Sequence, residues 1–219
     1  MDELDEGPAR RYGLAVVALV SALTLLVGLA AGLLLGRPSY PGDTSVDAGF
    51  ARDMSAHHAQ GVDMAMTIYP ATSDPELRSV SVDIGLTQQG QVGVMHTWLE
   101  TWGLSQTGSG PPMAWMAGHD HGGSSAPHTL RPDGLMPGMA TQAELARLRQ
   151  ATGKAKEILF LQLMIRHHQA GVVMAEVAVA RASRPEVRDL AQKIIDGQQG
   201  EIRVLTSFLR KRGARPLDS

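Results

Sequence analysis

The chain contains no cysteine, which excludes a disulfide scaffold, a thiolate zinc site, an iron–sulfur cluster and a thiol nucleophile. Aromatic residues make up only 4% of the chain, whereas it holds 11 methionines and 8 histidines. Without thiolates, any binding of a soft metal ion must use thioether and imidazole ligands. The composition therefore raises the question of metal binding before that of catalysis.

A large excess of either charge is also absent. Lysine and arginine together number 20, against 22 aspartate and glutamate residues, which leaves a formal net charge of −2. Proteins that wrap nucleic acid normally present a strongly basic surface, so we expect no nucleic-acid partner. With 219 residues, 43% of them hydrophobic, the chain is long and apolar enough to bury a core.

One long apolar run lies near the amino terminus, where the residues from Leu14 to Leu35 carry no charge. As a helix this run would rise about 33 Å, which matches a hydrocarbon core of about 30 Å. Arg10 and Arg11 precede it and Arg37 follows it, so the positive-inside bias places the amino end in the cytoplasm. A cleaved signal peptide is the alternative, although its apolar region is usually shorter, about 7–15 residues.

We therefore expect a single-pass protein of the cell membrane, with most of the chain on the extracytoplasmic side and the membrane as one of its partners. The expected parts are a cytoplasmic tail (1–13), a transmembrane anchor (14–36) and a tether (37–44).

The exported part contains an internal duplication. A shift of 110 residues aligns the two copies over about 55 residues without a gap. The matched positions include Phe50 with Phe160, Met54 with Met164, His57-His58 with His167-His168, Gly61 with Gly171, and Met64-Ala65 with Met174-Ala175.

Each copy is predicted to form two antiparallel helices. Ser73 and Ser183 each precede a glutamate by three residues, the capping-box arrangement that begins a helix, and Gly103 and Gly213 are placed to end those helices. Thr141 and Glu144 predict one further short helix. No stretch alternates with period two, so no strand is expected.

The predicted fold is all-α, a four-helix ferritin-like bundle made of two repeated hairpins and preceded by one transmembrane helix. Its parts are a first hairpin (45–103), a Met- and His-containing linker (104–140), a short helix with the second hairpin (141–213) and a tail (214–219).

The repeated residues share one face of their helices. On a helical wheel they occupy a sector of about 120°, which also holds Asp47 and its counterpart Glu157. Burying so many polar groups without partners costs about 1–3 kcal/mol each, so they need partners. Two are available: the amides of Gln88 and Gln198 on the second helices, or a metal ion. Neutral imidazole and thioether together suit copper, and the alternative is that the methionines are core packing.

The metal hypothesis names two groups of residues. In the bundle the predicted ligands are His57, His58, His167, His168, Met54, Met64, Met95, Met164, Met174, Asp47 and Glu157. In the linker they are Met113, Met116, His119 and His121, for which a polar spacer without metal is the alternative.

The repeated residues resemble those of the domain of unknown function 305 family. The pattern of an acidic residue, Phe, Met, His-His and Met-Ala begins here at Asp47 and again at Glu157, and Leu135 to Met139 also looks like that family. The likeness covers about residues 45–213. It implies a ferritin-like helical bundle, an extracytoplasmic location and, from some members, a role in handling copper. Gln91 departs from the glutamate typical of the family, which Glu201 keeps, and Met95 has Leu205 as its counterpart, so we expect the two halves to bind unequally.

The function expected from these observations is a membrane-anchored metal-binding protein that sequesters or delivers copper and is not an enzyme. A ferritin-like oxidase is less favoured, because its di-iron site needs Glu-x-x-His motifs and this chain has none. No nucleophile-elbow motif indicates a hydrolase. The remaining alternative is a metal-free structural or interaction bundle with an internal His/Gln hydrogen-bond network.

Overall fold

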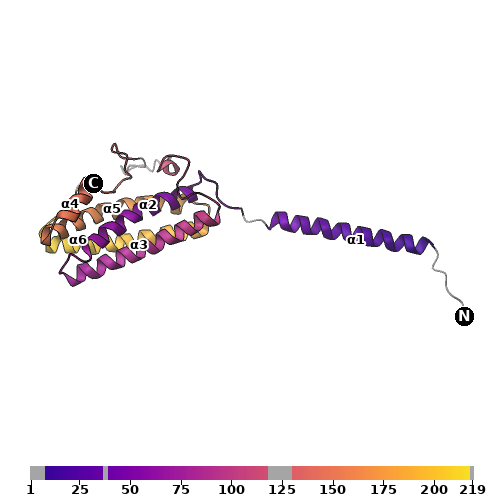
Figure 1. Cartoon of the computed structure of the whole chain (residues 1–219), viewed down its shortest axis with the longest axis horizontal. Coiled ribbons are helices and arrows are strands. Elements are labelled where there is room, and N and C mark those ends of the chain that lie inside the picture. Colours follow the sequence, from indigo (N-terminus) through magenta and orange to yellow (C-terminus); the bar gives the residue numbers. More distant parts are fainter. Residues whose placement is uncertain (1–7, 37–38, 118–129, 218–219) are drawn as a thin grey trace. The chain divides into compact units, whose positions relative to one another are not determined.

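The structure is a computed structural model, and it describes residues 8–36, 39–117 and 130–217 (Figure 1). These residues form six α-helices and one short 3₁₀ turn and contain no strand, so the prediction of an all-α chain is confirmed. The chain divides into two compact units, with the boundary between Tyr40 and Pro41.

The first unit is the helix α1 (Pro8–Leu35). Its segment Ala15–Leu33 has a mean hydropathy of 2.5 and no buried residue. In length and composition it is therefore suited to cross a membrane, as the uncharged run predicted. The helix begins before the apolar run, because it continues through Arg10 and Arg11.

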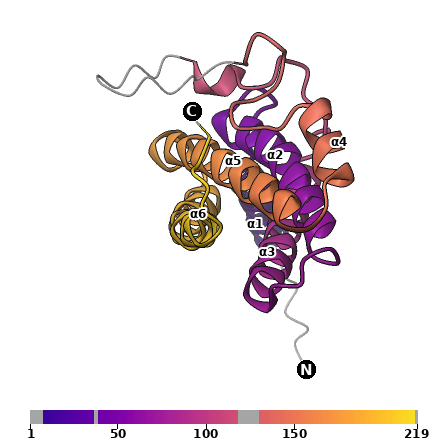
Figure 2. The same cartoon turned by 90° about the vertical axis from the view of Figure 1, so that its left-hand side faces the viewer.

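The second unit is built from two helical hairpins. The first consists of α2 (Val46–Ile68) and α3 (Pro75–Thr101), and the second of α5 (Gly153–Arg181) and α6 (Pro185–Lys211). The hairpins meet chiefly through α2 and α5, while α3 packs along α2 and α6 along α5 (Figure 2). The short α4 (Gln142–Gln150) and the turn η1 (Ala114–Met116) also pack on α2, which makes α2 the most covered helix of the unit.

Helix ends follow the predicted signals at most positions. Thr141 and Glu144 form the expected capping box of α4. Gly103 and Gly213 have φ angles of 68° and 73° and follow α3 and α6. In both places the next residue donates its N–H to a carbonyl five residues back, Leu104 to Leu99 and Ala214 to Leu209. This is the Schellman arrangement, which favours glycine because of its left-handed backbone.

The predicted helix starts at Ser73 and Ser183 are wrong by one residue. The N-cap of α3 is Asp74, whose carboxylate accepts from the Glu76 and Leu77 amides, and the N-cap of α6 is Arg184, which makes no side-chain cap. The reason is the proline that follows each cap, because proline is favoured as the first helical residue and shifts the cap to the residue before it.

The apolar core of the second unit forms two clusters. One contains Met54 and Met174 and the other contains Met64 and Met164. Along α2 the pair His57-His58 lies between Met54 and Met64, and along α5 the pair His167-His168 lies between Met164 and Met174. A polar layer of imidazoles therefore separates two methionine-containing cores.

Candidate metal centre

The four repeated histidines meet in one interior. All four have 0% of their surface exposed. The rings of His57 and His167, from opposite hairpins, stack with 3.7 Å between centroids and an angle of 24°. Within each helix the neighbouring ring lies further away, at 6.5 Å from His57 to His58 and 6.1 Å from His167 to His168. The structure thus brings together the two pairs that lie 110 residues apart.

Oxygen acceptors orient three of the rings. His58 Nε2 lies 2.7 Å from Gln91 Oε1, His168 Nε2 lies 2.6 Å from Glu201 Oε2, and His167 Nε2 lies 2.9 Å from the carbonyl oxygen of His57. Because each partner is an acceptor, Nε2 is the nitrogen that donates the proton in all three rings. In the neutral ring this leaves the lone pair on Nδ1.

Burial keeps most of these rings neutral. It lowers the pKa of His57 to about 3 and that of His58 to about 4, and it holds the pKa of His167 well below its ordinary value. For His57 and His167 the neighbouring imidazoles lower the pKa further, because adjacent positive charges repel. The neutral form that results is the one that ligates metal ions.

Several buried polar atoms in this layer have no hydrogen-bond partner among the described residues. They are the Nδ1 atoms of all four histidines, Nε2 of His57 and the side-chain amides of Gln88 and Gln198. The Pro137 backbone lies near His57 and raises its pKa, against the larger effect of burial, but its geometry is too poor for a hydrogen bond. Each atom without a partner costs about 1–3 kcal/mol if nothing satisfies it. The layer is therefore chemically incomplete as a hydrogen-bond network.

Glycines make room for the two amides. A Cβ at Gly61 would lie 2.1 Å from Gln88 Oε1, and one at Gly171 would lie 2.4 Å from Gln198 Oε1. The predicted amides thus lie beside the imidazole layer, but neither is hydrogen-bonded to a ring. The acceptors are instead Gln91 and Glu201, two positions that the family resemblance singled out without assigning them this role. Their spacing was a usable signal, since each follows one of the predicted glutamines by three residues and so shares its helix face.

The predicted carboxylate ligands have other partners. Asp47 accepts hydrogen bonds from the backbone amides of Ser183 and Arg184 at 3.1 and 2.8 Å, and from the Ser183 hydroxyl at 2.9 Å. Glu157 accepts from the Thr72 hydroxyl at 2.6 Å and from Arg212 Nε at 2.8 Å. Each carboxylate therefore fastens its own hairpin to the turn of the opposite hairpin.

The predicted methionines are all buried, at both ends of the imidazole layer. The cluster with Met54 and Met174 also holds Met95, Met113, Met116 and Met136, whereas the cluster with Met64 and Met164 holds no further methionine. Met113 and Met116 show that this part of the linker packs on the bundle. His119 and His121 lie outside the described residues.

A loop of the linker lies beside the stacked rings. Gly138 has a φ of 76°, and a Cβ there would lie 2.8 Å from the Arg166 carbonyl oxygen and 3.2 Å from His167 Cα. The Gln60 side-chain amide donates to the Ala140 carbonyl oxygen at 3.0 Å and accepts from the Ala140 N–H at 2.6 Å. The segment from Leu135 to Met139 thus contacts α5 directly at the histidine pair.

Among the described residues, no group of three or more His, Asp or Glu side chains is arranged to hold a metal ion as it stands. Binding at the imidazole layer would thus need thioether or amide ligands in addition, or a rotation of the rings. The buried nitrogens without partners remain the donor atoms that such an ion would use.

Comparisons with known proteins show similarity in sequence and overall fold to one family. Residues 47–209 match the family described as domain of unknown function (DUF305). A crystal structure of a DUF305 protein from Streptomyces coelicolor, named as a candidate secreted protein, is 40% identical, covers 81% of this chain and 100% of its own, and has a TM-score of 0.72. A DUF305 fragment from Deinococcus radiodurans is 32% identical, with coverages of 80% and 99% and a TM-score of 0.61.

A structure of CopM in the Cu(II)-bound form is 26% identical, covers 79% of this chain and 99% of its own, and has a TM-score of 0.55. No curated protein matches the chain. The family match spans both hairpins and the histidine layer between them. The chain therefore belongs to the DUF305 family.

Proposed function

We propose that this protein binds copper on the extracytoplasmic side of a membrane and sequesters or delivers the ion. The observation that carries the proposal is the set of buried imidazole nitrogens without partners, contributed by two equivalent helices that meet at their histidines. A function in binding rather than catalysis fits this set, and we assign the protein no reaction.

The chemistry of the layer suits copper. Neutral imidazoles bind both copper oxidation states, and thioethers favour Cu(I). The residues that would hold the ion are the four histidines, with Met54, Met64, Met164 and Met174 as the thioethers next along the same helices. Glu201 would act through His168, since a carboxylate that accepts from one imidazole nitrogen orients the ring and strengthens the other nitrogen as a ligand.

The comparison with CopM supports the choice of metal. That protein has a structure described as its Cu(II)-bound form, and it matches both hairpins of this chain at 26% identity. We extend copper binding from CopM to this chain because the donor types present here are the ones that copper prefers. We also propose that the hairpins form a ferritin-like four-helix scaffold around the site.

The membrane location rests on α1. We propose that α1 is an uncleaved anchor with its amino end in the cytoplasm, because Arg10 and Arg11 precede the apolar segment. Comparing the mass of the membrane-extracted protein with that of the whole sequence tests this. A product that begins beyond α1 would instead establish a signal peptide.

A metal-free structural bundle is the second candidate function. It is favoured by the hydrogen bonds that three of the rings already make, to Gln91, Glu201 and the His57 carbonyl. Under that reading the unpartnered nitrogens would be served by water, and copper would neither bind tightly nor stabilise the fold.

Titration of the full chain in detergent micelles with Cu(I), against a coloured Cu(I) chelator, separates the two candidates. We expect copper to be retained by the wild-type chain, and to be lost when all four histidines are replaced by asparagine. If that variant does not fold, the pair H58N and H168N leaves the stacked rings in place and should still weaken retention at least tenfold.

The matched control is H96N, since His96 lies on α3 outside the layer and its imidazole makes no hydrogen bond to another described residue. Equal copper retention by the wild type and the histidine variants would overturn the proposal. A metal-free wild type that copper does not stabilise would establish the structural candidate.

A further inference from the structure

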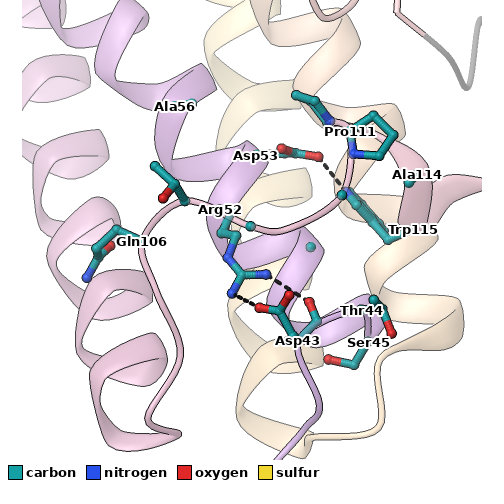
Figure 3. A pocket seen from close by; sticks show the side chains of 15 residues that line it. Asp43, Thr44, Ser45, Arg52, Asp53, Ala56, Gln106, Pro111, Ala114 and Trp115 are labelled. Carbon is teal, nitrogen blue, oxygen red and sulfur yellow. Dashed lines mark hydrogen bonds and ion pairs between the residues drawn. The ribbon is translucent and has the colours of Figure 1, made fainter.

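A pocket of about 470 Å³ lies outside the imidazole layer, between the first turns of α2 and the linker segment that follows α3 (Figure 3). Its walls are largely apolar, with Trp115 and Pro111 on one side. Its ionisable residues are Asp43, Arg52 and Asp53, so two carboxylates face one guanidinium. Neither the proposed copper site nor the packing of the hairpins uses this space.

Arg52 and Asp43 form an ion pair and share a further hydrogen bond. Arg52 donates to the Asp43 carboxylate at 2.5 Å, to the Asp43 carbonyl at 2.8 Å and to the Ser105 carbonyl at 2.9 Å. The second carboxylate oxygen of Asp43 accepts from the Ser109 hydroxyl at 2.5 Å. Arg52 is therefore paired directly with Asp43, and Asp53 is the carboxylate of the pocket that makes no ion pair of its own within the described residues.

Asp53 is a buried carboxylate held by neutral donors. Its Oδ2 accepts from the Met113 amide at 2.7 Å and from Trp115 Nε1 at 2.8 Å, while Oδ1 makes no hydrogen bond within the described part of the chain. Only 9% of Asp53 is exposed, and burial raises the pKa of its carboxyl by more than its two hydrogen bonds and the nearby Arg52 charge lower it. A desolvated carboxylate without a cation of its own is costly, so a positive ligand would be favoured here.

The duplication shows that the core does not require this charge. The position equivalent to Asp53 in the second copy is Leu163, which is also buried, and the position equivalent to Gly49 is Leu159. In the first copy Gly49 leaves space for Trp115, since a Cβ there would lie 2.4 Å from the indole Cδ1. Asp53 and Gly49, which both differ from their counterparts in the second copy, thus both contact Trp115 in the pocket wall.

We infer that this pocket binds a small organic ammonium ion, whose charge pairs with Asp53 and whose carbon chain packs on Trp115 and Pro111. An indole beside a carboxylate attracts such cations by two routes, through the carboxylate charge and through the ring face. A metal ion fits poorly, because one free carboxylate oxygen is not a ligand set and no metal-holding group of His, Asp or Glu occurs among the described residues.

The probe is n-butylammonium, added to the ¹⁵N-labelled full chain in detergent micelles, with the indole N–H signal of Trp115 as the readout. This proton is donated to Asp53, so it reports directly on a cation at that carboxylate. We expect a saturable shift with butylammonium, and none with butanol or butyrate, which share the carbon chain without the positive charge. An equal response to butanol or butyrate, or no saturable shift, would overturn the inference.

Two variants complete the test. D53N keeps an oxygen acceptor for Trp115 and should bind butylammonium at least tenfold more weakly. D63N removes the same charge from an exposed part of α2, where Asp63 pairs with Arg149 at the surface, and should bind like the wild type. Undiminished binding by D53N would refute the role of Asp53. If D53N fails to fold, the three probes on the wild-type chain still decide the outcome.

Discussion

The two hairpins place a histidine at the same point and give it different acceptors. His58 in the first hairpin meets the amide of Gln91, whereas His168 in the second meets the carboxylate of Glu201. An anionic acceptor makes its imidazole a stronger ligand than a neutral one does. Under the proposed copper function, the second hairpin would therefore supply the stronger imidazole ligand.

The turns of the hairpins differ as well. The first turn is capped from within, by Asp74, whereas the second has no side-chain cap of its own and relies on Asp47 from the other hairpin. The first turn thus has a cap of its own besides the bond from Thr72 to Glu157 of the second hairpin, whereas the amides of the second turn are bound by Asp47 of the first hairpin.

The largest expected effect is that of acidic pH. Burial lowers the pKa of His57 to about 3 and that of His58 to about 4. Below pH 6.5 the unfolded chain therefore binds protons at these histidines that the folded chain does not bind. The free energy of unfolding should therefore fall from pH 6.5 towards pH 4, by roughly 1.4 kcal/mol per pH unit for each such histidine, and stay level above pH 7. Urea unfolding across this range measures the slope, which H58Q should reduce.

Replacing Asp47 should cost more than replacing Asp74. D47A leaves two backbone amides and a hydroxyl of the second turn without their acceptor, and we expect a loss of about 2–4 kcal/mol. D74A removes an exposed cap and the ion pair with Arg212, and a loss of about 1 kcal/mol is expected. Urea unfolding at pH 7 compares them. Equal losses would mean that the second turn does not depend on the first hairpin.

Replacing the buried Gly61 or Gly171 by alanine should lower the free energy of unfolding by similar amounts. G61A and G171A each bring a Cβ against a glutamine amide, so we expect a loss of about 1–3 kcal/mol, which G61A combined with Q88A should partly restore. G93A is the matched control, because nothing lies within 4 Å of a Cβ there. It should stabilise α3 by up to about 1 kcal/mol. Thermal unfolding of the four variants checks this.

A small effect is also expected on the affinity for copper, and this prediction rests on the proposed function. E201Q makes the second half resemble the first and should weaken retention of copper by about tenfold, or about 1.4 kcal/mol, whereas Q91E should strengthen it. Chelator competition on the full chain gives both values. Opposite signs would show that the carboxylate hinders binding rather than supports it.

Much of this arrangement was accessible from residue spacing. The wheel correctly placed Met54, His57 and Met64 on a buried face, and the glycine and threonine signals located most helix ends. Such patterns report which face of a helix is buried. They do not report which element lies opposite, and for this reason the partners of Asp47 and Glu157 could not be anticipated.

Contacts between segments far apart in the chain could not be predicted from the sequence either. The anchoring of Trp115 on Asp53, 62 residues away, depends on how the linker folds back over α2. The acceptors Gln91 and Glu201 depend on the rotation of α3 and α6 about their own axes. Residue spacing restricts the rotation to one face of each helix, and packing decides whether Gln88 or Gln91 faces the ring on α3 and whether Gln198 or Glu201 does so on α6.

The stacked rings of His57 and His167 have one more consequence. Two positive charges at the observed 3.7 Å would repel by about 4 kcal/mol even at an effective dielectric constant of 20. The couple therefore accepts a first proton with difficulty and a second one hardly at all. Two imidazoles that would titrate independently when apart thus behave as one coupled unit, in which a charge on either ring opposes a charge on the other.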